Sequence, residues 1–129
     1  MDIFPPTHEA AWIGDETEVA RLVAEDGRRL NQQIQQGPWQ GCTPLMMAAD
    51  MGWEAVVSRL LALGADVRPR DRWGRTAAHL ACSGDGSGPA LALLLDHGAP
   101  LNLFDDYERY TPLMTAASAG ATACVAVLL

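Results

Sequence analysis

The side chains able to do acid–base or metal chemistry are three histidines and three cysteines, spread along the whole chain. A general base needs a nucleophile and an orienting group within hydrogen-bond reach. A zinc site needs pairs of ligands close together in the sequence. No such set is recognisable here, so we expect no catalytic residue, no metal site and no enzyme. The six residues are His8, His79, His97, Cys42, Cys82 and Cys124.

Two other segments have residue types that bind charged ligands. Gly84-Asp85-Gly86-Ser87-Gly88 is glycine-rich, but it follows an expected helix rather than a strand and lacks a nearby lysine, unlike a phosphate-binding loop. Asp105, Asp106 and Glu108 cluster, but a calcium loop needs more oxygen ligands at set spacing. We therefore expect no cofactor. We interpret the acidic cluster as a solvated patch that can select a basic partner segment.

The elements that must carry these residues repeat along the chain. The segment Thr43-Pro44-Leu45-Met46-Met47-Ala48-Ala49 returns from Thr76 and again from Thr111, 33 and then 35 residues further on. A period of this size indicates a stack of small units, none of which can bury its apolar face alone. Such a stack offers a long concave surface for binding and rarely a closed catalytic pocket.

Each unit resembles an ankyrin repeat, whose signature is Thr-Pro-Leu-His-x-Ala at a period of about 33 residues. The match continues after Thr43 through Gly52, Val56-Val57, Leu60-Leu61 and Gly64-Ala65-Asp66-Val67. The resemblance implies an all-α solenoid of stacked helix–turn–helix units with β-hairpin-like loops. It covers nearly the whole chain, so residues 1–129 are expected to be one domain. The repeats are approximately 1–36, 37–69, 70–103 and 104–129, the first degenerate and the last truncated.

The motif residues suit this fold physically. Thr43 and Thr111 can cap a helix N-terminus, each contributing about 1 kcal/mol, and the proline that follows loses no donor at the first helical position. Gly52 and Gly120 are expected to end the first helix of a unit with a positive φ. In the degenerate first unit, Pro5 takes the threonine position.

The resemblance also implies roles for several polar and aromatic side chains. His79, at the motif histidine position, and His8, at the matching position, are expected to hold neighbouring backbone by hydrogen bonds. Cys82 and Cys124 are expected to be small buried hydrophobes. We expect Cys42 to be exposed, Trp53 to be structural on the outer surface, and the first helix pair to close at Gly27.

By the same resemblance, recognition of a partner uses the hairpin tips and the exposed side of each first helix. Five of the eight aromatic residues fall at these positions, and aromatics and arginine are enriched at binding hot spots. The implied partner-binding residues are Trp12, Trp39, Met51, Arg70, Arg72, Trp73, Arg75, Tyr107 and Tyr110. We expect an aromatic strip that inserts between partner side chains while the arginines pair with partner carboxylates. The alternative is that each tryptophan braces its own or the next hairpin.

The composition of the chain limits the classes of partner that we expect it to bind. The net charge of −7 argues against a general nucleic-acid binder, which needs a basic field. No apolar stretch approaches the roughly 18 residues of a membrane span, so no membrane insertion is expected. An odd number of cysteines, about one repeat apart, favours free thiols in a reducing compartment. We expect a cytoplasmic protein, with the nucleus left open.

The sequence therefore predicts a non-catalytic protein–protein interaction module, a scaffold or targeting adaptor whose protein or peptide partner is not named by the sequence. One alternative is an accessory regulatory domain of a larger enzyme or channel, because Leu128-Leu129 align inside an expected second helix, as in part of a longer chain. A further alternative is a structural spacer or a solenoid that self-associates through this open apolar end.

Overall fold

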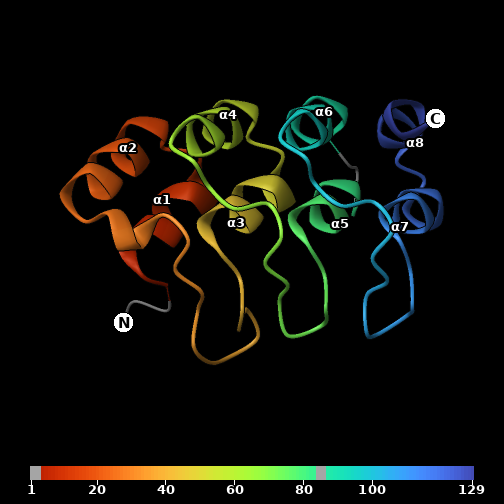
Figure 1. The fold of residues 1–129 in the computed structure, drawn as a ribbon, viewed down its shortest axis with the longest axis horizontal. Coiled ribbons are helices and arrows are strands. Elements are labelled where there is room, and N and C mark those ends of the chain that lie inside the picture. The colour runs from red at the N-terminus through yellow and green to blue at the C-terminus, as the bar shows by residue number, and fades with distance from the viewer. Residues whose placement is uncertain (1–3, 84–86) are drawn as a thin grey trace.

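The computed structural model describes residues 4–83 and 87–129, and within them every regular element is a helix. Figure 1 shows two rows, with α1, α3, α5 and α7 in one and α2, α4, α6 and α8 in the other. The bounds are α1 (Pro6–Ile13), α2 (Glu16–Glu25), η1 (Gly27–Arg29, a 3-10 turn), α3 (Pro44–Met51), α4 (Glu54–Ala62), α5 (Ala77–Cys82), α6 (Gly88–Asp96), α7 (Pro112–Ala119) and α8 (Thr122–Leu128). The predicted all-α stack is confirmed. One helix pair lies in each predicted repeat range, while the boundaries themselves stay a prediction.

The helix ends follow the predicted capping pattern. The hydroxyl of Thr43 accepts a hydrogen bond from the backbone N–H of Met46 at 3.2 Å, and that of Thr111 accepts one from Met114 at 3.4 Å. Gly52 and Gly120 end α3 and α7 in the left-handed region. Local sequence therefore determines where the first helix of each of these units begins and ends.

The first unit departs from this pattern. Pro5 precedes α1 and supplies no capping hydrogen bond. The expected closure of the second helix at Gly27 is wrong, because α2 ends at Glu25 and Asp26 is extended. The carboxylate of Asp26 then accepts from the N–H of Arg28 and starts η1 at Gly27. Gly27 therefore opens η1 and does not end α2 in the left-handed region.

The core lies between the two rows and between successive pairs. Within the first row, α1 packs on α3, α3 on α5 and α5 on α7, and α2, α4, α6 and α8 pack in the same order. Ala48 and Ala49 are buried, which lets the helices of the first row approach closely. In the last unit Ala116 is buried but Ala117 is exposed, since no described helix lies against that face of α7.

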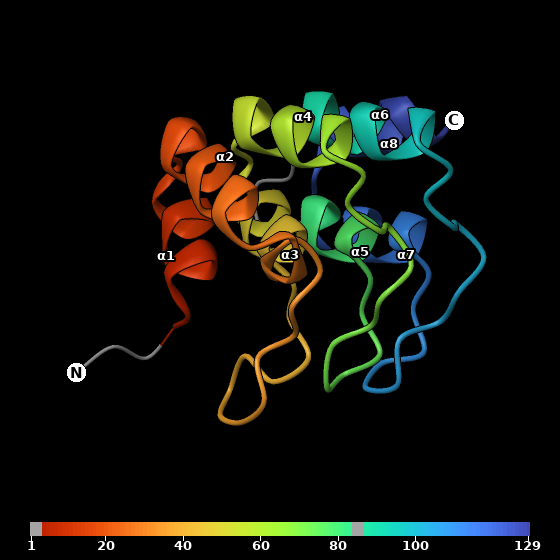
Figure 2. The same cartoon turned by 60° about the vertical axis from the view of Figure 1, so that its left-hand side comes forward.

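The loops that precede α3, α5 and α7 project together from the α1–α7 row (Figure 2). Neighbouring tips are joined by backbone hydrogen bonds, from Arg72 N to Gln40 O at 3.0 Å and from Asp106 N to Trp73 O at 2.7 Å. The tips therefore form one connected edge, and the side chains on them are held at fixed spacing.

This close approach explains the glycine found two residues before the motif threonine. Gly41 and Gly74 both have positive φ. A Cβ on Gly41 would lie 2.9 Å from the Cα of Asp71, and one on Gly74 would lie 2.5 Å from Oδ2 of Asp106. The equivalent position in the last unit is Arg109, which adopts a φ of 62° despite its side chain.

Candidate partner-binding surface

A buried aspartate organises the tip before α5. Oδ1 of Asp71 accepts from the backbone N–H groups of Trp73 and Arg75, both at 2.9 Å. Oδ2 of Asp71 accepts from Nε of Arg75 at 2.8 Å, and the Asp71 side chain is only 1% exposed. The carboxylate therefore sets the turn that presents Trp73 and at the same time neutralises Arg75.

Asp105 does the same for the tip before α7. Its Oδ1 accepts from the N–H groups of Glu108 at 2.9 Å and Tyr110 at 3.1 Å. Burial raises the pKa of Asp105, but these backbone hydrogen bonds outweigh burial and hold the pKa below its usual range. The expected solvated patch is therefore wrong for Asp105, because its carboxylate is buried inside its own turn, while Asp106 and Glu108 are exposed.

The two turns present an aromatic pair between them. The rings of Trp73 and Tyr107 meet edge to face, with centroids 5.4 Å apart and planes at 71°. Trp73 is 37% exposed and Tyr107 is 73% exposed. The guanidinium carbon of Arg72 lies 4.7 Å from the Trp73 ring centroid, within the range of a cation–π contact. We call Trp73 and Tyr107 the tip pair.

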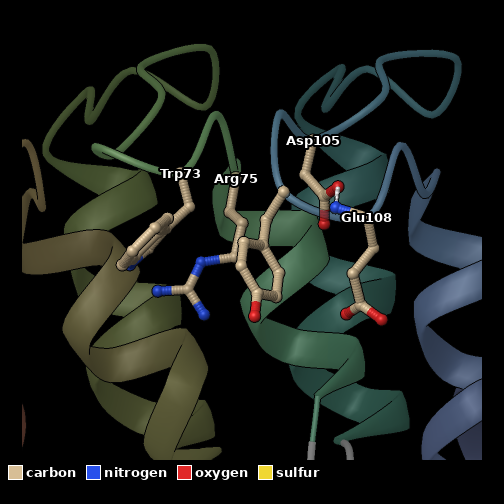
Figure 3. Close-up of a pocket in the computed structure, with 5 residues that line it drawn as sticks. Trp73, Arg75, Asp105 and Glu108 are labelled. Carbon is tan, nitrogen blue, oxygen red and sulfur yellow. Dashed lines mark hydrogen bonds between the residues drawn. The ribbon is translucent and has the colours of Figure 1, made fainter.

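The tip pair lines a pocket of about 350 Å³ with Arg75, Asp105 and Glu108. Figure 3 places Trp73 and Arg75 on one side of this pocket and Asp105 and Glu108 on the other. The two sides come from different units, so the pocket exists only because successive tips stack. Aromatic walls with a few polar groups are typical of surfaces that bind another molecule.

The predicted arginines are engaged within the chain. Arg70 donates to the carbonyl oxygens of Gly74 and Phe104 and lies 3.9 Å from the Asp106 carboxylate. Arg72 donates to the Gly37 carbonyl at 3.3 Å. Arg75 is held by the buried carboxylate of its own tip, whereas Arg70 and Arg72 fix neighbouring tips in place.

The aromatics of the first two units gather elsewhere. Phe4, Trp12 and Trp39 form a cluster with ring centroids 4.9 to 6.1 Å apart, and all three are half-buried against the core. We call this the N-terminal aromatic cluster. Trp53 donates from Nε1 to the Trp12 carbonyl at 2.7 Å, so its predicted structural role is confirmed. These rings brace the first two units together.

The remaining predicted positions are scattered. Met51 is 42% exposed at the end of α3, and Tyr110 is half-buried beside the motif threonine of the last unit. Gly84, with the rest of the glycine-rich segment through Gly86, lies outside the described residues. Trp73, Arg75 and Tyr107 are thus the predicted binding residues that share one pocket.

The two histidines at the motif position hold neighbouring backbone by hydrogen bonds, as expected. Nε2 of His79 donates to the Tyr110 carbonyl and Nε2 of His8 donates to the Cys42 carbonyl, both at 2.9 Å. Burial lowers the pKa of both imidazoles, which keeps them neutral. Each histidine therefore ties one unit to the loop of the next.

The three cysteines are free and buried. The expectation that Cys42 is exposed is wrong, because the residue is 1% exposed and belongs to the hydrophobic core. Burial, together with the nearby Asp71 carboxylate, raises the pKa of Cys42 to about 12. Burial and the neighbouring Cys124 raise the pKa of Cys82. Buried thiols of this kind are unreactive.

Neither a metal cluster nor a membrane span is found in the described part of the chain. Across residues 4–83 and 87–129, no three of the histidine, cysteine, aspartate and glutamate side chains are placed to hold a metal ion. No helix there is long and apolar enough to cross a membrane.

Sequence reasoning missed two residues that shape this surface. Asp71 carried a signal, since an aspartate five residues before the motif threonine can accept from the turn that follows it. Phe4 carried none, because its contacts with Trp12 and Trp39 form only when the first two units pack together. The aromatic positions alone could not separate the N-terminal aromatic cluster from the tip pair.

Known proteins share this architecture. The family model described as Ankyrin repeats (3 copies) matches residues 7–105 and 56–129. B-cell lymphoma 3 protein of Homo sapiens is 36% identical over 124 residues, covering 92% of this chain and 26% of the relative. NF-kappa-B inhibitor delta of Mus musculus is 32% identical over 98 residues, covering 75% of this chain and 30% of the relative. The chain therefore spans less than a third of the length of either relative.

Proposed function

The chain belongs to the ankyrin-repeat family, and from this premise we propose that it binds a partner protein, without catalysis, through the tips of its third and fourth repeats. Ankyrin repeats generally mediate protein–protein interaction. The relative NF-kappa-B inhibitor delta is named for what it inhibits and not for a reaction that it catalyses. Both facts favour a scaffold, adaptor or inhibitor over an enzyme.

The exposed tip pair is the observation that carries this proposal. The N-terminal aromatic cluster is packed against the core, whereas Tyr107 leaves 73% of its surface open beside Trp73. A large aromatic held by a rigid turn binds at low entropic cost, because little is lost in ordering it. The contact area needed for a specific partner is about 800 Å² on each side, so the concave surface beyond the pocket must contribute as well.

The buried turns support the same role. Asp71 and Asp105 hold each tip by hydrogen bonds from two backbone N–H groups. The tip pair is therefore organised before any partner arrives. If the chain forms part of a larger protein, the same surface makes it an accessory regulatory domain of that protein.

The test is capture of partners from a lysate of the source cells. The double variant Trp73→Ala, Tyr107→Ala removes the tip pair, and we expect it to lose the partner while remaining folded by circular dichroism. The matched control is Trp53→Ala, which removes an indole of similar exposure (41%) on the outer row. Equal capture by both variants and by the native chain would move the binding surface away from these tips.

A second candidate function is self-association through the last helix pair. Leu113 and Met114 of α7 are 39% and 45% exposed. Adjacent exposed apolar side chains favour contact with another surface. Sedimentation equilibrium over a range of concentrations measures this directly. A single monomer mass at all concentrations, unchanged in Leu113→Glu, contradicts it.

A further inference from the structure

The charges that line the pocket between the third and fourth tips are not balanced. Arg75 is paired with the buried Asp71 carboxylate at 2.8 Å. Asp105 is buried and receives backbone N–H groups. Glu108 is exposed, and within residues 4–83 and 87–129 its carboxylate makes no ion pair. The pocket therefore keeps one lining charge without a partner, and that charge is negative.

The nearby arginines do not supply the missing positive charge. Arg70 is directed to two carbonyl oxygens and to Asp106. Arg72 donates to the Gly37 carbonyl and lies over the Trp73 ring. Both are therefore engaged at other sites on the tips, outside the pocket lining.

The aromatic wall of the pocket is suited to a cation. An aromatic face attracts a guanidinium or ammonium group electrostatically, and Arg72 already uses the Trp73 ring in this way. The ring of Tyr107, 73% exposed, lines the same pocket as Glu108. In Figure 3, Glu108 lies across the pocket from Trp73 and Arg75. Because the Arg75 guanidinium is already paired with Asp71, the lining groups left for an entering cation are the aromatic rings and the Glu108 carboxylate.

We infer that this pocket takes an arginine side chain from a basic segment of the partner protein, an inference that rests on the proposed function. The guanidinium stacks on Tyr107 and donates to the Glu108 carboxylate. Arginine fits better than lysine because its planar group can stack and donate at the same time. The net charge of −7 adds a general attraction for such a segment.

The inference is tested with a fluorescein-labelled, glycine-spaced arginine peptide and two matched peptides. One carries citrulline, which keeps the shape of arginine without its charge, and the other carries glutamate. Fluorescence anisotropy at low ionic strength gives the dissociation constants. We expect the native chain to bind the arginine peptide about fivefold more tightly than the citrulline peptide, and the glutamate peptide most weakly.

Two pairs of variants distinguish binding of the peptide in the pocket from its attraction to the net negative charge of the chain. Glu108→Gln should weaken the arginine peptide about threefold, whereas Glu54→Gln, which removes the same charge from an exposed position in the first turn of α4, should leave it nearly unchanged. Tyr107→Ala should weaken it about fivefold, and Tyr107→Phe, which keeps the ring, should not. Glu108→Gln leaves the backbone N–H that anchors the turn in place, so the fold is retained.

Three outcomes would overturn the inference. Equal weakening by Glu108→Gln and Glu54→Gln would show attraction by net charge alone. Tighter binding of the glutamate peptide, lost in Arg75→Gln, would assign the pocket to an acidic partner and leave the proposed function intact. If the native chain binds none of the three peptides, the inference that the pocket takes an arginine side chain is wrong. Lysate capture by the double variant Trp73→Ala, Tyr107→Ala would still decide whether these tips bind a protein.

Discussion

The first two and the last two repeats use the same kinds of side chain in opposite ways. In the first half, Trp12 and Trp39 turn inward and pack with Phe4 in the N-terminal aromatic cluster. In the second half, Trp73 and Tyr107 meet edge to face, Arg72 lies over the Trp73 ring, and both rings stay exposed. The difference shows that the residue type does not decide the role of these aromatic side chains. A ring that neighbouring side chains cover stabilises the fold, and a ring that they leave exposed can contact a partner.

The motif histidines repeat this contrast. In the third repeat, Nδ1 of His79 accepts from the N–H of Thr76 at 3.1 Å and lies 3.0 Å from its hydroxyl. In the first repeat, Pro5 stands where the threonine would be and has neither group. Nδ1 of His8 is buried without a hydrogen-bond partner in the described structure. The first repeat therefore relies on aromatic packing where the third relies on a capping box.

The largest test removes each histidine in turn. His79→Ala should lower the free energy of unfolding by about 3 kcal/mol, since it leaves the Tyr110 carbonyl and Thr76 without their partner. His8→Ala should cost about 2 kcal/mol, because only the bond to the Cys42 carbonyl is lost. Urea denaturation followed by circular dichroism gives both values. A loss at His8 as large as that at His79 would mean that the missing cap has no energetic consequence.

The second test compares the aromatic groups. Trp39→Ala should cost about 2 kcal/mol of stability, because the ring is half-buried in the N-terminal aromatic cluster. Tyr107→Ala should cost at most about 0.5 kcal/mol, since most of the side chain is already in water. The same denaturation experiment decides the matter, with Tyr107→Phe as the conservative control. Equal losses of stability in Trp39→Ala and Tyr107→Ala would mean that both rings stabilise the fold to the same extent. The proposed difference between the first two and the last two repeats would then be wrong.

The third test rebuilds the missing cap. Pro5→Thr should raise stability by about 1 kcal/mol, because the new hydroxyl can accept from the backbone of the first turn while the new N–H donates to Nδ1 of His8. In the double variant Pro5→Thr, His8→Ala the part of this gain that depends on His8 should vanish. A gain that persists there in full would assign the effect to helix capping alone, without the histidine.

The smallest effect is expected at the last tip. Arg109→Gly should stabilise the chain by about 0.5 to 1 kcal/mol, because Arg109 adopts a φ of 62° that glycine tolerates without strain. Gly37→Ala is the matched control, since that glycine also has positive φ and its added Cβ would meet no atom within 4 Å. We expect it to destabilise the chain by a similar amount. A destabilising Arg109→Gly would show that the arginine side chain stabilises the turn.

Much of the fold could be predicted because each repeat is coded locally. The threonine caps at Thr43 and Thr111, the prolines that follow them and the glycines at the helix ends act within one turn of the chain. Contacts in such a stack are made mainly with neighbouring repeats, so a motif that recurs at a fixed period also specifies what packs against it. The prediction was wrong at Gly27, which opens η1 instead of ending α2.

The candidate surface was less predictable. Trp39 and Tyr107 both lie four residues before the motif threonine of their repeats, yet Trp39 is half-buried in the N-terminal aromatic cluster and Tyr107 is exposed. Cys42 and Asp105 were expected to be exposed, and both are buried. In each case the deciding atoms belong to the next tip or to the residue's own turn, and the motif does not specify those contacts.

The sequence by itself determined the repeat, the helix ends and the order of the stack, because these depend on capping and on apolar spacing within each unit. It also determined the inventory of aromatic and charged side chains at the tips. Only the tertiary structure decided which aromatics are covered and which arginines are already engaged. It also showed that, among the residues the structure describes, Glu108 has no ion-pair partner and lies beside an exposed ring. Those outcomes depend on contacts between units, where one tip covers, neutralises or leaves open the side chains of the one before it.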